Sequence, residues 1–346
     1  MFSRLILATR CALVGVTALA VGGCQHVIDS QIEQGVNRAD RGMLTSPDLQ
    51  VVLCGTGSPL PDKTRAGACT AIVAGGQVVL VDVGPGAWKT LDLAGVPTGA
   101  LSAVLLTHFH SDHIGDLGEA ITQSWIAGRS QPLPVYGPPG TARLVNGFDE
   151  AYAQDADART LHHGEQYMPR AAEPAVAHEI EIGDAADADA LVFERDGLKV
   201  TMFRVHHDPV RPAVGYRFDY KGRAVVVSGD TAKTASIVEH AKGADVLINE
   251  ALNRDMMGRV SEVATRVGQP RLGKMANDTL NYHTTPVEAA EMARDAGVHT
   301  LVLTHLVPGP RNFLTRHMFL SGVAETFNGE VVLGEDGTRI DLPPKS

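Results

Sequence analysis

The chain has 346 residues, enough for one large domain or two domains of ordinary size. Hydrophobic residues make up 44% of the chain and charged residues 20%, as in a typical globular protein. The formal net charge is −10, and loss of residues 1–23 would remove Arg4 and Arg10 and make it −12. Because affinity for phosphates comes mostly from Lys and Arg, this charge argues against nonspecific nucleic-acid binding, although it leaves room for a local basic patch.

The N-terminal segment has the pattern of an export signal. Arg4 and Arg10 precede a short apolar stretch, 11–21. This stretch leads into the sequence Val-Gly-Gly-Cys24. This junction resembles the lipobox of bacterial lipoproteins, in which the Cys is diacylated and becomes the new N-terminus. An ordinary signal peptide and a noncleaved anchor are the alternatives. We therefore expect a signal peptide over 1–23, lipidation of Cys24, and a lipid-anchored protein in the cell envelope that faces the periplasm or the exterior.

The rest of the chain divides into a short polar segment and one domain. Residues 24–48 lack apolar periodicity after the cysteine, which predicts a tether between membrane and domain. No linker or repeat interrupts residues 49–346. Apolar runs between Gly-rich turns predict strands in this domain at 49–54, 71–74, 78–83, 103–107, 134–136, 199–205, 214–220, 224–228, 245–249 and 300–304. Periodic segments with capping residues predict helices at 87–95, 116–127, 141–153, 232–241 and 286–296.

The order of these elements indicates an α/β domain built from two similar halves. Strands come first, followed by alternating helices and strands, and the same succession then recurs. The segment 154–190 is acidic and Ala-rich, and we expect it to be irregular. Together with the residues up to 197 it is expected to shape the mouth of a pocket.

A cluster of ligand-type side chains follows the predicted strand 103–107. The sequence His108-Phe-His110-Ser-Asp112-His113 places three imidazoles and one carboxylate within six positions. These groups suit zinc and similar divalent metals. Alternate residues of an extended segment face the same side, so His108 and His110 can bind one ion, while the following turn can direct Asp112 and His113 to a second ion.

This motif resembles the hallmark of the metallo-β-lactamase superfamily. Further segments, including LCGTGSPLPD, LVDVGPG, VYGPPGT and PAVGYRFDYKGRAVVVSGDT, look like its ribonuclease Z and arylsulfatase-like branch. The resemblance covers nearly all of the chain after residue 48. It implies a four-layer αββα sandwich, with the metal site between the edges of two sheets.

The resemblance also implies roles for particular residues. Two zinc ions are expected to be held by His108, His110, His207, Asp112, His113, Asp230 and His305. His207 is preferred over its neighbour His206, and Asp230 is expected to bridge both ions. Manganese or iron would suit similar ligands.

Three other residues are expected to act around these ligands. Asp82 is expected to hold a ligand imidazole by its free N–H, the alternative being a turn-forming Asp before Gly. His283 is expected to face the substrate and protonate a leaving oxygen, although it also lies at a helix start. Glu250 is a candidate for orienting His283.

These residues favour a two-metal hydrolase that cleaves a sulfate ester or a phosphodiester, with Asp112 as proton acceptor. The alternatives are a tRNA 3′-processing endonuclease of the ribonuclease Z type, a lactonase or β-lactamase, and a noncatalytic metal-binding lipoprotein. Ribonuclease Z enzymes insert a long arm between the equivalents of His207 and Asp230, and only residues 208–229 lie there. We therefore expect a small-molecule ester substrate, no nucleic-acid partner and membrane contact only through the lipid, and we allow for a homodimer.

Two cysteines remain once the signal peptide, which contains Cys11, is removed and Cys24 is lipidated. They lie near each other in the first predicted strands. Cys54 ends one strand and Cys69 opens the next, and antiparallel neighbours lie within the distance that a disulfide bridges. An exported protein would meet oxidising conditions. A disulfide between Cys54 and Cys69 is therefore expected, the alternative being two buried thiols that do not meet.

Overall fold

A computed structural model of the protein describes residues 25–183, 185 and 187–345. The chain divides into two compact units, Met1–Asp40 and Arg41–Ser346. In the first unit, residues 25–36 form a helix with exposed side chains, in a segment whose polar composition had predicted only an irregular tether. Among the described residues, no helix is both long and apolar enough to cross a membrane. The predicted signal peptide 1–23 and Cys24 lie outside the described residues.

The second unit contains two seven-stranded sheets in the part of the chain that the structure describes. The first has the strand order β14-β1-β2-β3-β4-β5-β6. Its strands are β1 (Leu49–Gly55), β2 (Cys69–Ala74), β3 (Gln77–Val81), β4 (Leu101–Leu105), β5 (Leu133–Gly137), β6 (Ala175–Glu179) and β14 (Arg339–Leu342). Strands β1 to β3 pair antiparallel, and β3 to β6 pair parallel.

The second sheet repeats this plan with the order β13-β12-β11-β10-β9-β8-β7. Its strands are β7 (Asp189–Arg195), β8 (Leu198–Arg204), β9 (Val214–Tyr220), β10 (Arg223–Val227), β11 (Val246–Leu252), β12 (Thr300–Val307) and β13 (Glu330–Leu333). Strands β7 to β10 pair antiparallel, and β10 to β13 pair parallel. The expectation of two similar halves therefore agrees with the pairing.

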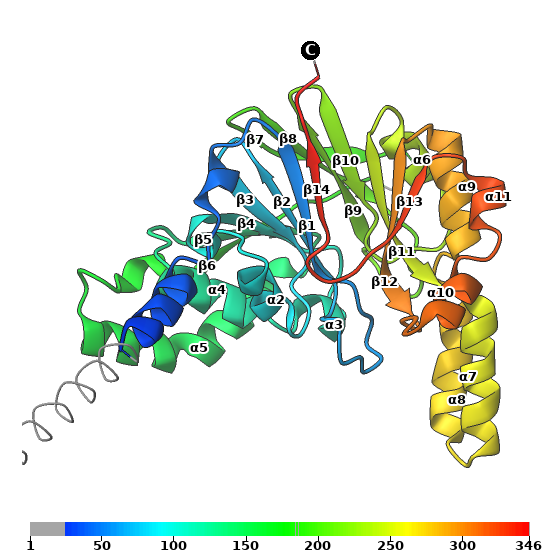
Figure 1. Ribbon diagram of the computed structural model, residues 1–346, viewed down its shortest axis with the longest axis horizontal. Coiled ribbons are helices and arrows are strands. Elements are labelled where there is room, and N and C mark those ends of the chain that lie inside the picture. The colour runs from blue at the N-terminus through cyan, green and yellow to red at the C-terminus, as the bar shows by residue number, and fades with distance from the viewer. Residues whose placement is uncertain (1–24, 184, 186, 346) are drawn as a thin grey trace, which may run out of the picture. The chain divides into compact units, whose positions relative to one another are not determined.

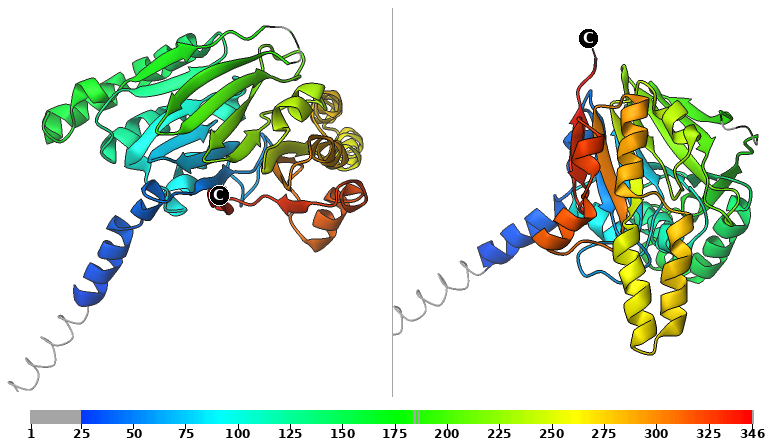
Figure 2. Two further views of the ribbon diagram at one scale, coloured as in Figure 1. Left: turned by 90° about the horizontal axis from the view of Figure 1, so that it is seen from above. Right: turned by 90° about the vertical axis from the view of Figure 1, so that its right-hand side faces the viewer.

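Helices cover the outer face of each sheet (Figures 1 and 2). Those of the first half are α2 (Ala87–Leu93), α3 (Ser111–Ile114), α4 (Leu117–Ile126) and α5 (Thr141–His163). Those of the second half are α6 (Ala235–Ala241), α7 (Arg254–Arg266), α8 (Pro270–Asp278), α9 (Pro286–Ala296), α10 (Phe313–Phe319) and α11 (Val323–Thr326). Short 3₁₀ helices lie at Arg41–Leu44, Thr98–Ala100, Arg170–Ala172 and Thr279–Asn281.

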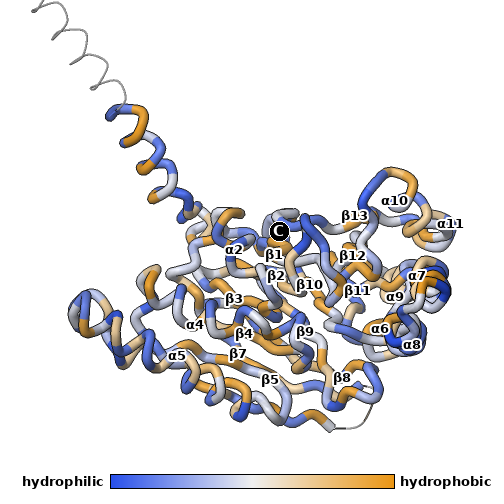
Figure 3. The backbone as a smooth tube through the Cα atoms, turned by 90° about the horizontal axis from the view of Figure 1, so that it is seen from below, coloured by the Kyte–Doolittle hydropathy of each residue, from blue (hydrophilic) through white to orange (hydrophobic). Residues whose placement is uncertain are grey.

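Three hydrophobic cores define the four layers. One core, with Val51, Ile72, Phe218 and Ile248, lies between the two sheets. The others pack the sheets against their helices, as Leu91 and Ile121 do in the first half and Ile237 and Met292 in the second. Every residue of β1 and of β11 is buried, because such strands are covered on both faces. Figure 3 shows hydrophobic residues along these central strands. The predicted αββα sandwich is confirmed.

The structure also contains elements that the sequence did not predict. The segment 154–190 is not irregular throughout, because α5 continues to His163 and the edge strand β6 follows. Helices α7 and α8 form a hairpin that projects beyond the sheets (Figure 1, and the right view of Figure 2). Asn253 caps α7 by accepting a hydrogen bond from the Met256 amide, and Pro270 begins α8.

Candidate metal centre

The predicted ligands lie at the ends of strands from both sheets. His108 and His110 follow β4, and Asp230 follows β10. His305 lies in β12 with φ 46°, next to a register shift between β11 and β12. This irregularity lets β12 continue while His305 departs from the regular ladder. His283 precedes α9, whose start is fixed by a capping box at Thr285.

Ligand atoms gather in three groups at this edge, two of which share Asp230. His108, His110, His207 and Asp230 each offer an atom within 4.8 Å of the others. The same holds for Asp112, His113 and His305, and for Asp230, His283 and His305. The Asp230 Oδ2 atom lies within 4.0 Å of a ring nitrogen of each of His108, His113, His207, His283 and His305. Asp230 is thus the carboxylate shared by two of these groups, as expected for a bridging ligand.

Three of these ligand atoms take part in no hydrogen bond. Among the described residues, the buried atoms His113 Nε2, His207 Nε2 and Asp230 Oδ1 have no hydrogen-bond partner. Buried polar groups are normally paired, and a converging set of unpaired imidazole and carboxylate atoms has the chemistry of a metal site. The residues present therefore fit a divalent metal.

Hydrogen bonds from residues around the ligands fix which ring nitrogen of each histidine faces the centre. Asp82 Oδ2 accepts from His113 Nδ1 at 2.8 Å, so the structure places Asp82 where the sequence analysis expected it. Asp82 also accepts from the Thr107 amide and hydroxyl, at 2.8 and 2.7 Å. Because the Thr107 hydroxyl donates to Asp82, it can accept from His108 Nδ1 at 3.0 Å. Each bond uses Nδ1, so Nε2 is the nitrogen that would bind a metal. In this structure His108 Nε2 lies 2.9 Å from His110 Nδ1.

Two further partners come from the other half of the molecule. The Tyr282 carbonyl accepts a hydrogen bond from His207 Nδ1 at 3.1 Å. Glu250 Oε1 accepts from His283 Nδ1 at 3.0 Å and from the Thr284 amide at 2.9 Å. Sequence reasoning had named Glu250 but had missed Thr107 and Tyr282. Every residue has a backbone carbonyl, so residue type could not predict the role of Tyr282. Thr107 precedes the first ligand His108, and this position could have indicated its role.

The protonation states of His108, His207 and Asp230 agree with metal binding. His113 differs, because burial acts to lower its pKa but Asp230 and then Asp82 raise it well above its usual value. Burial lowers the pKa of His207 to about 4 and that of His108 well below its usual value, so both rings are neutral. Burial acts to raise the pKa of Asp230, but the surrounding histidines, His305 and His113 first, hold it well below the usual range. Metal ligands must be neutral imidazoles and ionised carboxylates, and His108, His207 and Asp230 meet that requirement.

His283 has the opposite shift. Burial acts to lower its pKa, but the Glu250 carboxylate, the hydrogen bond to it and then Asp230 raise the pKa to about 9. The ring is therefore protonated near neutral pH and holds a proton that it can donate.

His206 and His207 differ in position as predicted. His207 is buried with Nε2 3.8 Å from Asp230 Oδ2, whereas the His206 side chain is 57% exposed, with Nε2 3.5 Å from Asp208 Oδ2. His207 also forms a bridge with Val210, which turns the chain after β8. The structure thus brings His207 into the centre and leaves His206 outside it.

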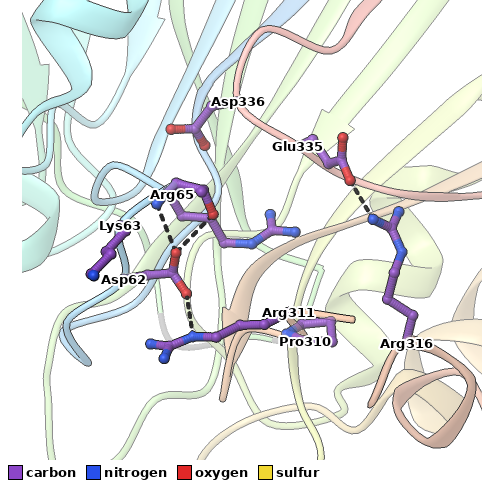
Figure 4. A pocket seen from close by; sticks show the side chains of 9 residues that line it. Asp62, Lys63, Arg65, Pro310, Arg311, Arg316, Glu335 and Asp336 are labelled. Carbon is purple, nitrogen blue, oxygen red and sulfur yellow. Dashed lines mark hydrogen bonds and ion pairs between the residues drawn. The ribbon is translucent and has the colours of Figure 1, made fainter. Parts of the chain in front are cut away.

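Two cavities flank the loop 56–66. A cavity of about 360 Å³ reaches the metal-site residues and has Leu60 and the hairpin α7–α8 in its wall. A second cavity of about 460 Å³, shown in Figure 4, is lined by charged side chains that include Lys63, Arg65, Arg311 and Arg316. The segment 154–197, expected at the pocket mouth, contributes no residue to the metal-side cavity.

Carboxylates hold this charged region together. Asp62 accepts from Arg311 at 3.2 Å and Glu335 pairs with Arg316. Asp336 accepts from the amides of Thr56 and Ala66 at 2.9 and 2.7 Å, which anchors both ends of the loop.

The disulfide lies at the base of the same loop. Cys54 and Cys69 are bonded across β1 and β2, with Cα atoms 4.9 Å apart and a sequence separation of 15. Both side chains are buried. The loop between them is therefore tied at its strand ends.

The fold and this site define a hydrolase of the metallo-β-lactamase superfamily with a divalent-metal site. The β-lactamase superfamily domain family matches residues 77–306. Ribonuclease Z of Mycobacterium bovis is 38% identical over 302 residues, which cover 86% of this chain and 99% of the relative. Ribonuclease Z of Mycolicibacterium paratuberculosis is 39% identical over 301 residues, with coverage of 86% and 100%. The chain belongs to the ribonuclease Z branch of the superfamily.

Solved structures show the same fold at lower identity. The short form of human tRNase Z aligns with TM-score 0.61 and 24% identity, over 85% of this chain and 100% of that one. The metallo-β-lactamase fold protein YhfI of Bacillus subtilis aligns with TM-score 0.61 and 22% identity, over 85% and 99%.

The expectation of a small-molecule ester substrate and no nucleic-acid partner is contradicted by these relatives, which are named for a ribonuclease. The net charge of −10 averages over the whole chain. It does not describe the second cavity, where Lys63, Arg65, Arg311 and Arg316 lie together with three carboxylates. The short segment between His207 and Asp230 was also a poor argument, because this chain covers nearly the full length of relatives that carry the name.

Proposed function

We propose that the protein is a metal-dependent phosphodiesterase that cleaves RNA, with two divalent ions, zinc by default, as its cofactors. The observation that carries the proposal is the 38% identity to a ribonuclease Z along nearly the whole relative, combined with the two ligand groups around Asp230. Seven ligands that share one central carboxylate suit a pair of ions better than one ion.

The proposed chemistry assigns separate tasks to the residues of the centre. When bound, the two ions supply positive charge against the phosphoryl oxygens and lower the pKa of water. Asp112, with Oδ2 3.1 Å from His305 Nε2, lines the same cavity and is placed to accept the proton of the attacking water. His283, protonated and held by Glu250, is placed to donate a proton to the leaving ribose oxygen.

Cations near the site supply the contacts that RNA phosphates need. Lys63 and Arg65 lie on the loop 56–66, which also carries Leu60 of the metal-side cavity. Arg311 and Arg316 line the same charged cavity. Guanidinium and ammonium groups bind phosphate oxygens through charge-assisted hydrogen bonds. We propose that these four cations hold the RNA backbone beside the metal centre.

The experiment compares RNA with simpler esters. The zinc-loaded protein is incubated with RNA that carries a 3′ extension, with a bis-aryl phosphate and with an aryl sulfate, and the RNA products are mapped. We expect metal-dependent cleavage of RNA, hydrolysis of the bis-aryl phosphate, and loss of both activities on chelation. The proposal would be refuted if the protein hydrolysed the aryl sulfate but cleaved neither the RNA nor the bis-aryl phosphate.

A variant tests the role of Asp230 and the number of ions. Elemental analysis of the wild type should find about two divalent ions per chain, following the two-metal template. Asp230→Ala should lower the occupancy of both sites, because the carboxylate lies between them. Lys233→Ala, whose side chain pairs with Glu291 at the surface, serves as the control and should keep full occupancy.

A further inference from the structure

The metal-side cavity has two chemically different ends. At one end lie the candidate ligands His110, Asp112, Asp230 and His305. The other end is walled by apolar side chains, Leu60 and Val307 from the body and Met257, Val260, Leu272 and Met275 from the hairpin α7–α8. A substrate with its phosphate at the metal end therefore places a neighbouring group against this apolar wall.

Charge decides what that neighbouring group is. No Lys or Arg is among the described residues that line the cavity. A second phosphate at the apolar end would be desolvated without a cation to compensate it, which is costly. The neighbouring group is therefore uncharged and largely apolar, and in RNA the chemical group with these properties is a nucleobase.

The hairpin residues at this end behave as a binding surface. Met257 and Ala276 are buried and pack with Leu252 and Val307, which fixes the hairpin to the body. In contrast, Leu272 is 42% and Met275 is 57% exposed. Exposed apolar side chains that line a cavity next to a reaction centre are typical of a ligand-binding surface.

The position of the hairpin is defined rather than loose. A Cβ on Gly273 would lie 2.2 Å from Thr265 Oγ1, so the two helices approach each other closely there. Ser261 Oγ donates to the Gly273 carbonyl at 2.7 Å, which joins α7 to α8. Arg254, at the start of α7, pairs with Glu288 of α9 at 3.0 Å. These contacts hold the wall at a set distance from the metal ligands.

We propose that the hairpin cavity receives one unpaired nucleobase of the RNA, the base adjacent to the scissile phosphate. The assignment rests on the proposed function, because it takes the phosphate to lie at the metal end. A volume of about 360 Å³ accommodates one nucleoside. The sulfurs of Met257 and Met275 can contact the ring of the base favourably. Cleavage is therefore directed to sites where a base can leave its stack.

The test uses the methyl groups of the cavity methionines as reporters. Zinc-loaded protein with ¹³C-labelled methionine methyls is titrated with adenosine 5′-monophosphate, which contains no bond for the enzyme to cleave between nucleotides. Ring currents of the base should shift the methyl signals of Met257 and Met275 and leave that of Met318 in α10 unchanged. Ribose 5-phosphate, which has the phosphate but no base, should leave all three unchanged. Absent shifts, or equal shifts with ribose 5-phosphate, would overturn the assignment.

A matched pair of variants measures the contribution of the wall. A contact between a methionine sulfur and an aromatic ring contributes about 0.3–1.5 kcal/mol, or about 2–13-fold in affinity. The double variant Leu272→Ala/Met275→Ala should therefore bind adenosine 5′-monophosphate at least about twofold more weakly, and ribose 5-phosphate as before. Val263→Ala/Val267→Ala alters exposed apolar residues of α7 and its C-terminal end that do not line the cavity, and should bind like the wild type. Equal weakening by both pairs would contradict the assignment.

RNA cleavage separates this proposal from the proposed function. Two RNAs are compared, one with a normal nucleotide and one with an abasic nucleotide beside the scissile phosphate. Equal cleavage rates for the two would overturn the cavity assignment and leave the ribonuclease function standing. Base-dependent methyl shifts in a protein that cleaves no RNA would support the cavity as a base site and refute the ribonuclease function.

Discussion

His206 and His207 are neighbours in the chain, yet one side chain faces solvent and the other faces Asp230. The loss of an outer hydrogen-bond partner in such sites reduces metal affinity or activity by about 10–100-fold. The loss of a ligand should cost more. We therefore expect His207→Ala to lose metal and nearly all activity, and His206→Ala to keep both. Metal content and phosphodiesterase rates of the two variants measure this, and the reverse ranking would show that the chain register after β8 is wrong.

A pH profile tests His283. Its pKa is raised to about 9, so the protonated donor is present at neutral pH and is lost as the pH rises through that value. The rate should therefore fall on the alkaline side in the wild type. Glu250→Gln removes the carboxylate that raises this pKa, so the fall should begin at lower pH. An alkaline limb that is unchanged in both Glu250→Gln and His283→Ala would contradict the assignment. Unchanged metal content in the variants separates proton donation from ligation.

The ligands themselves were accessible from sequence because residue type and spacing carry their chemistry. Histidines and aspartates at the ends of apolar strands identify the centre from the sequence alone. The hydrogen bonds that orient the ligand histidines were harder to predict from the sequence. Asp82 has a distinctive place before Gly84, but the Tyr282 carbonyl belongs to a backbone that any residue would supply. Contacts made by backbone groups depend on tertiary structure alone.

Among the secondary-structure elements, strands rich in apolar residues were found from the sequence. β9 has the predicted bounds 214–220, and the wholly buried β1 and β11 differ from prediction by one to three residues at their ends. The edge strand β7 was missed, because it mixes charged and exposed residues, and Leu191 there is 56% exposed. Helix α5 also hides its pattern, because only Thr141, Val145 and Ala156 of its residues are buried. The hairpin α7–α8 did carry signals, namely the Asn253 cap, the Gly268 turn and Pro270, and these could have been read.

The loop 56–66 and the strands beside it offer a test at the level of the element. The Cys54–Cys69 disulfide closes a loop of 15 positions, which in the chain-entropy treatment stabilises the folded state by about 3 kcal/mol. Reduction should therefore lower the free energy of unfolding by about that amount, measured by urea denaturation with and without reductant. The double variant Cys54→Ala/Cys69→Ala is the control, since reductant should not change its stability. Unfolding curves of the wild type that coincide under both conditions would contradict the role of the disulfide.

On the scale of the molecule, net charge was the least informative property. A total of −10 predicted no nucleic-acid partner, while the relatives are ribonucleases. Electrostatic fields act locally, and at moderate ionic strength they extend about 10 Å. The charged cavity carries four cations and three carboxylates, so its local charge is opposite in sign to that of the whole chain. The position of charges relative to the centre, and not their sum, bears on the substrate.

The disulfide and the N-terminal sequence together lead to a proposal about location. Buried disulfides form and persist mainly in oxidising compartments, and Cys54–Cys69 is one. The sequence before Cys24, which lies outside the described residues, has the pattern of a lipoprotein signal. We propose that the protein is exported and held at the membrane by lipid on Cys24. An RNA-cleaving enzyme so placed would meet RNA that has left the cytoplasm.

Replacement of Cys24 tests this proposal. Cys24→Ser removes the thiol that carries the lipid, so the protein should be released from the membrane or remain uncleaved. Fractionation without detergent and the mass of the N-terminal peptide measure the result. Cys11→Ser is the matched control, because Cys11 lies within the segment that would be removed and its replacement should leave the anchored protein unchanged. Wild-type protein that lacks an acyl mass on its N-terminal peptide yet needs detergent for extraction would contradict lipidation at Cys24, because a bilayer then holds the chain by something other than this cysteine.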